Sequence, residues 1–132
     1  MKITADTNLL LRATLRDDAH QTQVAAQALR EAELIAIPIS VLCEFAWVLN
    51  RGFKKPVAQT AEAIKRLMLT PKVVLNRPVV EAGLALMAAG GDFADGVIAH
   101  EGMWLGAEEF VSFDAKAVTL LQSQGVRSRL LA

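Results

Sequence analysis

Short apolar segments that suit β-strands alternate with helix-forming segments along the chain, and this alternation constrains the fold most. The expected strands are Lys2–Ala5, Leu34–Ile37, Val73–Leu75, Glu109–Phe113 and Val126–Arg129. The expected helices are Leu9–Leu15, Gln21–Glu33, Ser40–Leu49, Val57–Leu69, Val79–Ala89, Phe93–Leu105 and Ala115–Ser123. Strands that alternate with helices favour a mostly parallel sheet with helices on both faces, so we expect an α/β fold.

The size of the chain fits one domain. It has 132 residues, and we expect a single domain over residues 1–132, because domains of roughly 100–150 residues are the most common. Apolar residues make up 53% of the chain and charged residues 21%, which is typical of a globular protein. The formal net charge is zero, so a nucleic acid would have to be bound by a local basic patch.

The sequence favours a cytoplasmic location without a membrane anchor. Its longest apolar run, Ile35–Leu49, is interrupted by Pro38, Ser40 and Glu44, and it is too short to span a bilayer. Cys43 is the only cysteine, which excludes an intramolecular disulfide and a cysteine-based zinc site and suits a reducing compartment. The first residues, MKITADT, become polar too early for a signal peptide.

Four acidic residues interrupt or directly end apolar segments. They are Asp6 in KITADTNLLL, Glu44 in ISVLCEFAWVL, Asp95 in FADGVIAH and Asp114 in EFVSFDAKAV. An ionised carboxylate in a dry interior is costly unless it is paired or bound to a metal. No run of buried bases is present to pair with these four, so they indicate one shared site for a divalent cation such as Mg²⁺, which takes oxygen ligands.

The position of two of these acids supports such a site. Asp6 and Asp114 each follow an expected strand, and ligands of parallel α/β sheets bind at the carboxyl ends of the strands. Either aspartate is also suited to capping the helix that follows it. Thr7 and Asn8 are alternative caps beside Asp6, and Asn8 is a candidate for orienting a ligating carboxylate. Ser112 is expected to share the sheet edge with Asp114.

Glu44 and Asp95 lie within expected helices. The helix Ser40–Leu49 is expected to be buried nearly all round, so Glu44 needs a metal or, as the alternative, a salt bridge to a distant arginine. Asp92 and Asp95 share a helix face near its start. Acids are favourable in a first helical turn, which accounts for Asp92 as a cap, and we expect Asp95 to be the metal ligand.

Four convergent carboxylates are able to hold one or two Mg²⁺ or Mn²⁺ ions, and paired ions clamp the attacking and leaving oxygens of a phosphoryl transfer. Without a metal, clustered acids repel and raise one another's pKa, so an empty site is expected to destabilise the fold locally. The chain has no G-x-x-x-x-G-K-[ST], G-x-G-x-x-G or G-x-S-x-G motif. The sequence therefore offers no phosphate-binding loop and no serine nucleophile.

A basic patch follows the helix that contains Glu44. Arg51, Lys54 and Lys55 surround Phe53 in an expected loop, Asn50–Lys55. Basic groups hold phosphates while metal ions act on one of them, and an exposed aromatic ring stacks on an unpaired base. The alternative is an ordinary solvated loop, particularly for the two lysines.

The segments ADTNLLLR, ISVLCEFAWVL, DFADGVIAH and FVSFDAKA resemble the PIN-domain ribonucleases, in particular the VapC toxins of bacterial toxin–antitoxin pairs. The resemblance implies a three-layer α/β/α sandwich with a mostly parallel sheet, Mg²⁺- or Mn²⁺-dependent cleavage of RNA, homodimerisation and inhibition by a cognate antitoxin. It also implies roles for six residues. Asp6, Glu44, Asp95 and Asp114 would form the catalytic, metal-binding quartet, with Asn8 and Ser112 as supporting residues.

Two positions depart from this family's pattern. Ser112 stands where the family often has threonine, and Gly96 stands where alanine is common. A glycine lowers the stability of a helix by roughly 1 kcal/mol, but neither change removes a ligand.

Two other functions stay open. One is another Mg²⁺-dependent phosphoryl-transfer protein, such as a phosphatase or a receiver, although Asn8 occupies the position where a haloacid-type phosphatase has its second aspartate. The other is a non-catalytic partner-binding module whose acidic pocket captures an arginine from another protein. Metal-dependent cleavage distinguishes both from a nuclease.

Overall fold

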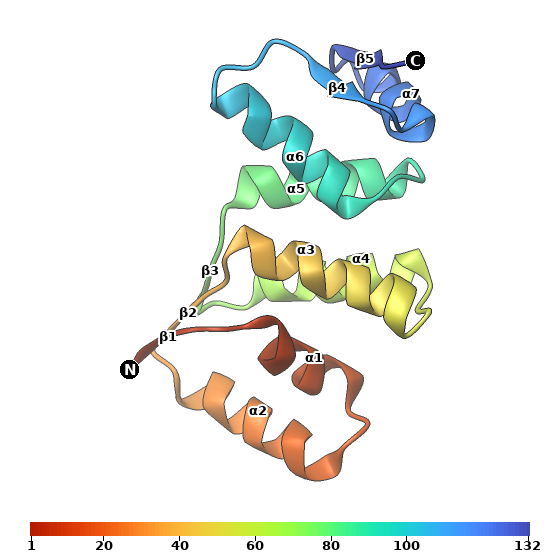
Figure 1. Cartoon of the computed structure of the whole chain (residues 1–132). Coiled ribbons are helices and arrows are strands. Elements are labelled where there is room, and N and C mark those ends of the chain that lie inside the picture. The colour runs from red at the N-terminus through yellow and green to blue at the C-terminus, as the bar shows by residue number, and fades with distance from the viewer. The chain divides into compact units, whose positions relative to one another are not determined.

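The computed structural model describes all of residues 1–132, and they form two compact units, Met1–Asn76 and Arg77–Ala132. Figure 1 labels the elements of both units.

The first unit is built on a parallel sheet of three short strands, in the order β1-β2-β3. The strands are β1 (Lys2–Thr4), β2 (Leu34–Ala36) and β3 (Val73–Val74), and Ile35 in β2 pairs with Ile3 on one side and Val73 on the other. The helices are α1 (Thr7–Leu15), α2 (Ala19–Glu31), α3 (Ile39–Trp47) and α4 (Val57–Leu69), with a π-helical turn, η1 (Val48–Gly52), directly after α3. The largest fully buried side chains of this unit include those of Leu10, Ile35, Leu42, Phe45 and Ile64.

The second unit begins with two closely packed helices, α5 (Arg77–Ala88) and α6 (Phe93–Trp104). They are followed by β4 (Phe110–Ser112), α7 (Ala115–Ser123) and β5 (Ser128–Leu130). The two strands are parallel, with Phe110 opposite Ser128 and Ser112 opposite Leu130. Leu86, Ala99 and Leu121 form the centre of a core cluster that joins α5, α6 and α7.

A glycine allows α5 and α6 to approach closely. A Cβ atom at Gly96 in α6 would lie 2.5 Å from the carbonyl oxygen of Ala82 and 2.9 Å from the Cα of Gly83, both in α5. Such contacts are far shorter than van der Waals separations, and the Ala82 oxygen belongs to the backbone of a helix. Close helix packing therefore explains why this chain has glycine where alanine is common, in spite of the lower helix propensity of glycine.

The helix-rich α/β architecture with parallel strands confirms the expected PIN-like fold class. Every expected strand and helix is present, with ends that differ by a few residues. The expected loop Asn50–Lys55 is partly wrong, because its first residues belong to the π-helical turn η1. The expectation that the helix with Glu44 is buried nearly all round is also wrong: Ser40, Glu44 and Trp47 are exposed along one face of α3.

None of the helices combines the length and the apolar character that a membrane-crossing segment requires.

Candidate metal centre

Two aspartates of the second unit, Asp92 and Asp114, act electrostatically on a third, Asp95. Burial raises the pKa of Asp95, and the negative charges of Asp92 and Asp114 raise it further. A carboxylate in the first turn of a helix is ordinarily stabilised by the helix dipole. The raised pKa of Asp95 means that desolvation and repulsion outweigh this stabilisation, as expected for clustered acids without a counter-charge.

Helix α6 presents two of these acids. Asp92 occupies the N-cap position, but its side chain accepts no hydrogen bond from the first turn. Asp95 lies within that first turn and is half-buried. The expectation that the side chain of Asp92 caps the helix is therefore wrong. The raised pKa still distinguishes Asp95 from an ordinary first-turn acid.

Asp114 reaches the cluster from the end of β4, where it forms the N-cap of α7. Its Oδ1 accepts a hydrogen bond of 3.1 Å from the backbone N–H of Ala117. Its own backbone N–H donates a hydrogen bond of 2.9 Å to Oγ of Ser112. The Ser112 hydroxyl thus helps to hold the backbone conformation of Asp114. Helix capping uses only one carboxylate oxygen of Asp114, so the other oxygen is available for a ligand.

Asp6 is likewise the N-cap of α1, and its Oδ1 accepts a hydrogen bond of 2.8 Å from the backbone N–H of Leu9. One carboxylate oxygen of Asp6 therefore caps α1, as the alternative interpretation of this residue expected. Asp6 and Asn8 also line a cleft of about 390 Å³, together with Arg12 and His20. His20 thus lies beside two predicted site residues.

Glu44 lies on the exposed face of α3 with Ser40 and Trp47, and it forms no ion pair. A salt bridge to a distant arginine is therefore absent. The premise that all four acids interrupt buried segments is wrong, since Asp6, Glu44 and Asp114 are exposed and only Asp95 is half-buried. Only Asp95 is distinguished from an ordinary surface acid, because burial, and then the charges of Asp92 and Asp114, raise its pKa.

A comparison with protein families decides the class of the chain. The PIN domain family matches residues 3–118. The chain belongs to the PIN domain family. PIN domains are typically metal-dependent nucleases, commonly with Mg²⁺, which makes this chain a hydrolase of the nuclease class and disfavours a phosphatase or receiver. A comparison with curated proteins found no match.

The acids of this PIN domain suit a divalent cation only in part. Asp6 and Glu44 belong to the first unit and Asp95 and Asp114 to the second, and in neither unit do three or more His, Cys, Asp or Glu side chains form a group able to hold a metal. Mg²⁺, however, is commonly bound through one or two carboxylates together with waters and substrate phosphates. The oxygen donors of Asp95 and Asp114 therefore fit Mg²⁺ or Mn²⁺, and their repulsion is what a cation would relieve.

The raised pKa of Asp95 predicts how the metal-free protein responds to pH. Below the ordinary titration range of aspartate, Asp95 is protonated in both the folded and the unfolded chain. As the pH rises, the unfolded chain loses this proton first, so the stability of the fold falls until Asp95 is ionised in both states. We therefore expect Asp95→Asn to be more stable than the parent at neutral pH and to lack this part of the pH dependence.

Urea unfolding at a series of pH values, with a chelator present, measures this effect. Glu101→Gln, a change near the other end of the same helix, is the matched control and should leave the pH dependence of the parent unchanged. A parent that is more stable than Asp95→Asn at neutral pH would contradict the destabilising role of the Asp95 charge.

Proposed function

We propose that this PIN-domain protein is an endoribonuclease that cleaves RNA phosphodiester bonds with the help of Mg²⁺ or Mn²⁺. The observation that carries the proposal is the half-buried carboxylate of Asp95, whose pKa is raised by burial and by the charges of Asp92 and Asp114, because clustered carboxylate oxygens suit a hard cation. The choice of RNA is supported by the resemblance of ADTNLLLR and FVSFDAKA to the VapC ribonucleases.

The residues have distinct roles in this proposal. Asp95 and Asp114 hold the cation, and Ser112 sets the backbone of Asp114 through its hydrogen bond. Asp6 and Glu44 complete the acidic quartet that the resemblance implies, with Asn8 in a supporting role. When bound, a divalent cation would stabilise the negative charge that develops on the phosphoryl oxygens. One of the carboxylates would accept the proton of the attacking water.

The biological role that we propose is that of a VapC-type toxin, acting as a homodimer and inhibited by a cognate antitoxin. The acidic pair Asp95 and Asp114 supports this mode of inhibition, since an arginine side chain of a partner would neutralise it as a cation does. Arginine capture without catalysis is the competing function.

Expression of the parent in bacteria should arrest growth, and expression of Asp95→Asn should not. Growth arrest by both proteins would favour arginine capture.

The direct test is a cleavage assay with end-labelled single-stranded RNA in Mg²⁺, in Mn²⁺ and in a chelator. We expect products with either ion and none with the chelator. DNA of the same sequence is the control for substrate class and should be cleaved far more slowly. RNA that stays intact in both metals, or that is cleaved equally with the chelator, would contradict the proposal.

A further inference from the structure

The segment Arg51–Lys55, called the basic loop below, concentrates positive charge on an exposed surface. All five of its residues are exposed, and three of them are basic. Arg51, Lys54 and Lys55 form no ion pair, and the chain has no acidic residue between Glu44 and Glu62. The positive charge of the basic loop is therefore not neutralised locally.

The first unit has an excess of basic residues, and the basic loop contributes three of them. The unit Met1–Asn76 contains ten basic and seven acidic residues, whereas the unit Arg77–Ala132 contains four and seven. Without the three cations of the basic loop, the first unit has seven of each sign. A protein of zero net charge thus has three basic residues within one five-residue exposed segment, which is the kind of local patch that binding to a polyanion requires.

The backbone of the basic loop is held in a defined conformation. The N–H of Phe53 donates to the carbonyl of Val48 at 2.9 Å, and the N–H of Lys55 donates to the carbonyl of Leu49 at 2.8 Å. Lys54 has a left-handed backbone conformation, with φ of 53°, which is costly for a residue other than glycine and persists only where the surroundings enforce it. The loop is consequently preorganised, so a ligand would not have to order it.

An exposed aromatic ring lies among these cations. The side chain of Phe53 is 44% exposed, although the ring is apolar and the segment around it is charged. An aromatic side chain within a positively charged surface is the arrangement by which proteins bind single-stranded nucleic acid, since the ring stacks on a base while the cations contact phosphates.

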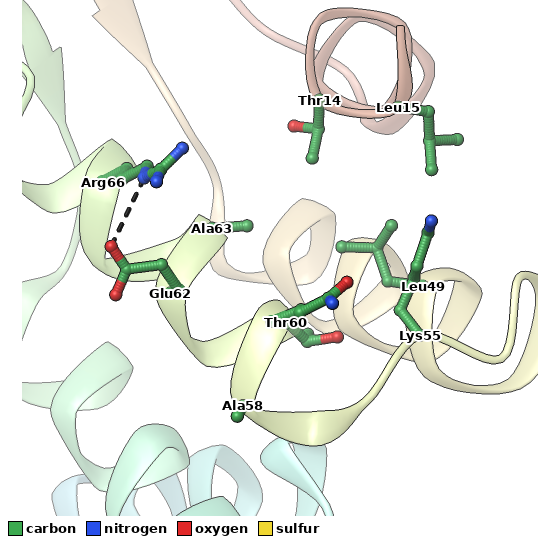
Figure 2. Close-up of a pocket in the computed structure, with 10 residues that line it drawn as sticks. Thr14, Leu15, Leu49, Lys55, Ala58, Thr60, Glu62, Ala63 and Arg66 are labelled. Carbon is green, nitrogen blue, oxygen red and sulfur yellow. Dashed lines mark hydrogen bonds and ion pairs between the residues drawn. The ribbon is translucent and has the colours of Figure 1, made fainter. Parts of the chain in front are cut away.

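A pocket beside the basic loop extends this surface. It has a volume of about 320 Å³, and its lining includes Lys55, Thr14 and Arg66. Figure 2 shows the side chain of Lys55 directed toward α1, where Thr14 and Leu15 lie, and Arg66 further along α4. Arg66 forms an ion pair of 3.3 Å with Glu62, in which both side chains are largely exposed, and such a pair opens at little cost.

We propose that the basic loop is the RNA-binding surface of this nuclease, with Arg51, Lys54 and Lys55 on consecutive phosphates of a single strand and Phe53 stacked on an unpaired base. The strand would continue past Lys55 into the pocket, toward Arg66. This inference rests on the proposed function for the identity of the polyanion. It assigns substrate binding to a surface separate in sequence from all four predicted metal ligands.

Binding without cleavage tests the inference. Fluorescence anisotropy of a labelled single-stranded RNA is measured against the parent in a chelator, at several salt concentrations. The test variant combines Arg51→Gln, Lys54→Asn and Lys55→Gln, because asparagine tolerates the left-handed conformation at position 54. The matched control combines Lys2→Gln, Arg30→Gln and Lys65→Gln, which remove three exposed cations of the same unit. Circular dichroism and thermal unfolding verify that both triple variants are folded.

We expect the test variant to bind RNA roughly tenfold or more weakly than the parent at low salt. The slope of log K against log salt should fall by about 2, since each phosphate contact on a single strand contributes about 0.7. The control variant should change the slope much less. Equal affinity of parent and test variant, or an equal loss in the control variant, would overturn the inference.

A second variant separates stacking from charge. Phe53→Ala should weaken binding of single-stranded RNA about fivefold or more, the lower end of the usual effect of one stacked base. The same change should leave binding of duplex RNA unaltered, because paired bases are not free to stack on the ring. An effect of Phe53→Ala that is equal for both RNAs would overturn the assignment of Phe53.

The inference and the proposed function fail in different ways. Loop-dependent RNA binding by a protein that never cleaves RNA would contradict the nuclease proposal and support the RNA-binding surface. Metal-dependent cleavage by a protein whose RNA affinity does not depend on the loop would support the nuclease proposal and overturn the inference. Loop-dependent binding of polyglutamate as tight as that of RNA would also overturn it, in favour of an acidic protein partner.

Discussion

Replacement of Asp95 by asparagine is expected to lower metal-dependent RNA cleavage by roughly a hundredfold or more. Changes of residues that merely support a metal ligand already cost roughly 10–100-fold, and Asp95 is proposed to be a ligand itself. Asparagine keeps the size of the side chain but removes the charge that attracts the cation. Burial and the charges of Asp92 and Asp114 raise the pKa of Asp95, so a bound cation would stabilise its ionised form.

The same variant is expected to be more stable than the parent when no metal is present. Loss of activity together with a gain in stability would distinguish a metal ligand from a residue that merely supports the fold. Glu101→Gln, in the same helix, is the matched control and should cleave at the rate of the parent. Full activity of Asp95→Asn in Mg²⁺ would contradict the assignment of Asp95.

Replacement of Gly96 by alanine is expected to lower the free energy of unfolding by about 1–3 kcal/mol, the usual cost of overpacking. The added Cβ would lie 2.5 Å from the carbonyl oxygen of Ala82, so α5 and α6 would have to move apart. Helix propensity acts in the opposite direction, since alanine is favoured over glycine by up to about 1 kcal/mol in a helix. We expect the backbone clash to outweigh this gain.

Gly102→Ala is the matched control for this effect, because Gly102 lies in the same helix. A Cβ atom there would meet only the Cβ of Ala107, at 4.0 Å, which is an ordinary contact. This variant should therefore be as stable as the parent or more stable, by up to about 1 kcal/mol. Chemical denaturation of both variants gives the comparison, and a Gly96→Ala protein that is more stable than the parent would contradict the close packing of α5 on α6.

Much of the secondary structure was predictable because residues with strong local preferences mark the ends of the elements. Helix α4 begins directly after Pro56, and α7 lies between Asp114 and Gly125, so their expected bounds agree with the structure. The π-helical turn η1 was missed, since the apolar spacing of a helix continues through Leu49 and contains no signal for a change of hydrogen-bonding register.

The acids of the site were harder to interpret from the sequence. Asp6 and Asp114 each serve as an N-cap, a role that uses the same residue type in the same strand–helix context as a metal ligand. The pattern of apolar residues also suggested that Glu44 is buried, whereas it lies on an exposed helix face. The expectation of one shared acidic site anticipated that Asp114 acts on Asp95, but the burial that contributes most to the raised pKa of Asp95 depends on tertiary structure.

Calorimetric titration of Mn²⁺ into the parent and into Asp95→Asn tests the central claim most directly, because it measures the cation site without requiring the RNA target. We expect binding to the parent that is lost or greatly weakened in Asp95→Asn and retained in Glu101→Gln. Binding of equal strength to the parent and to Asp95→Asn, or no binding to the parent at millimolar metal, would contradict it.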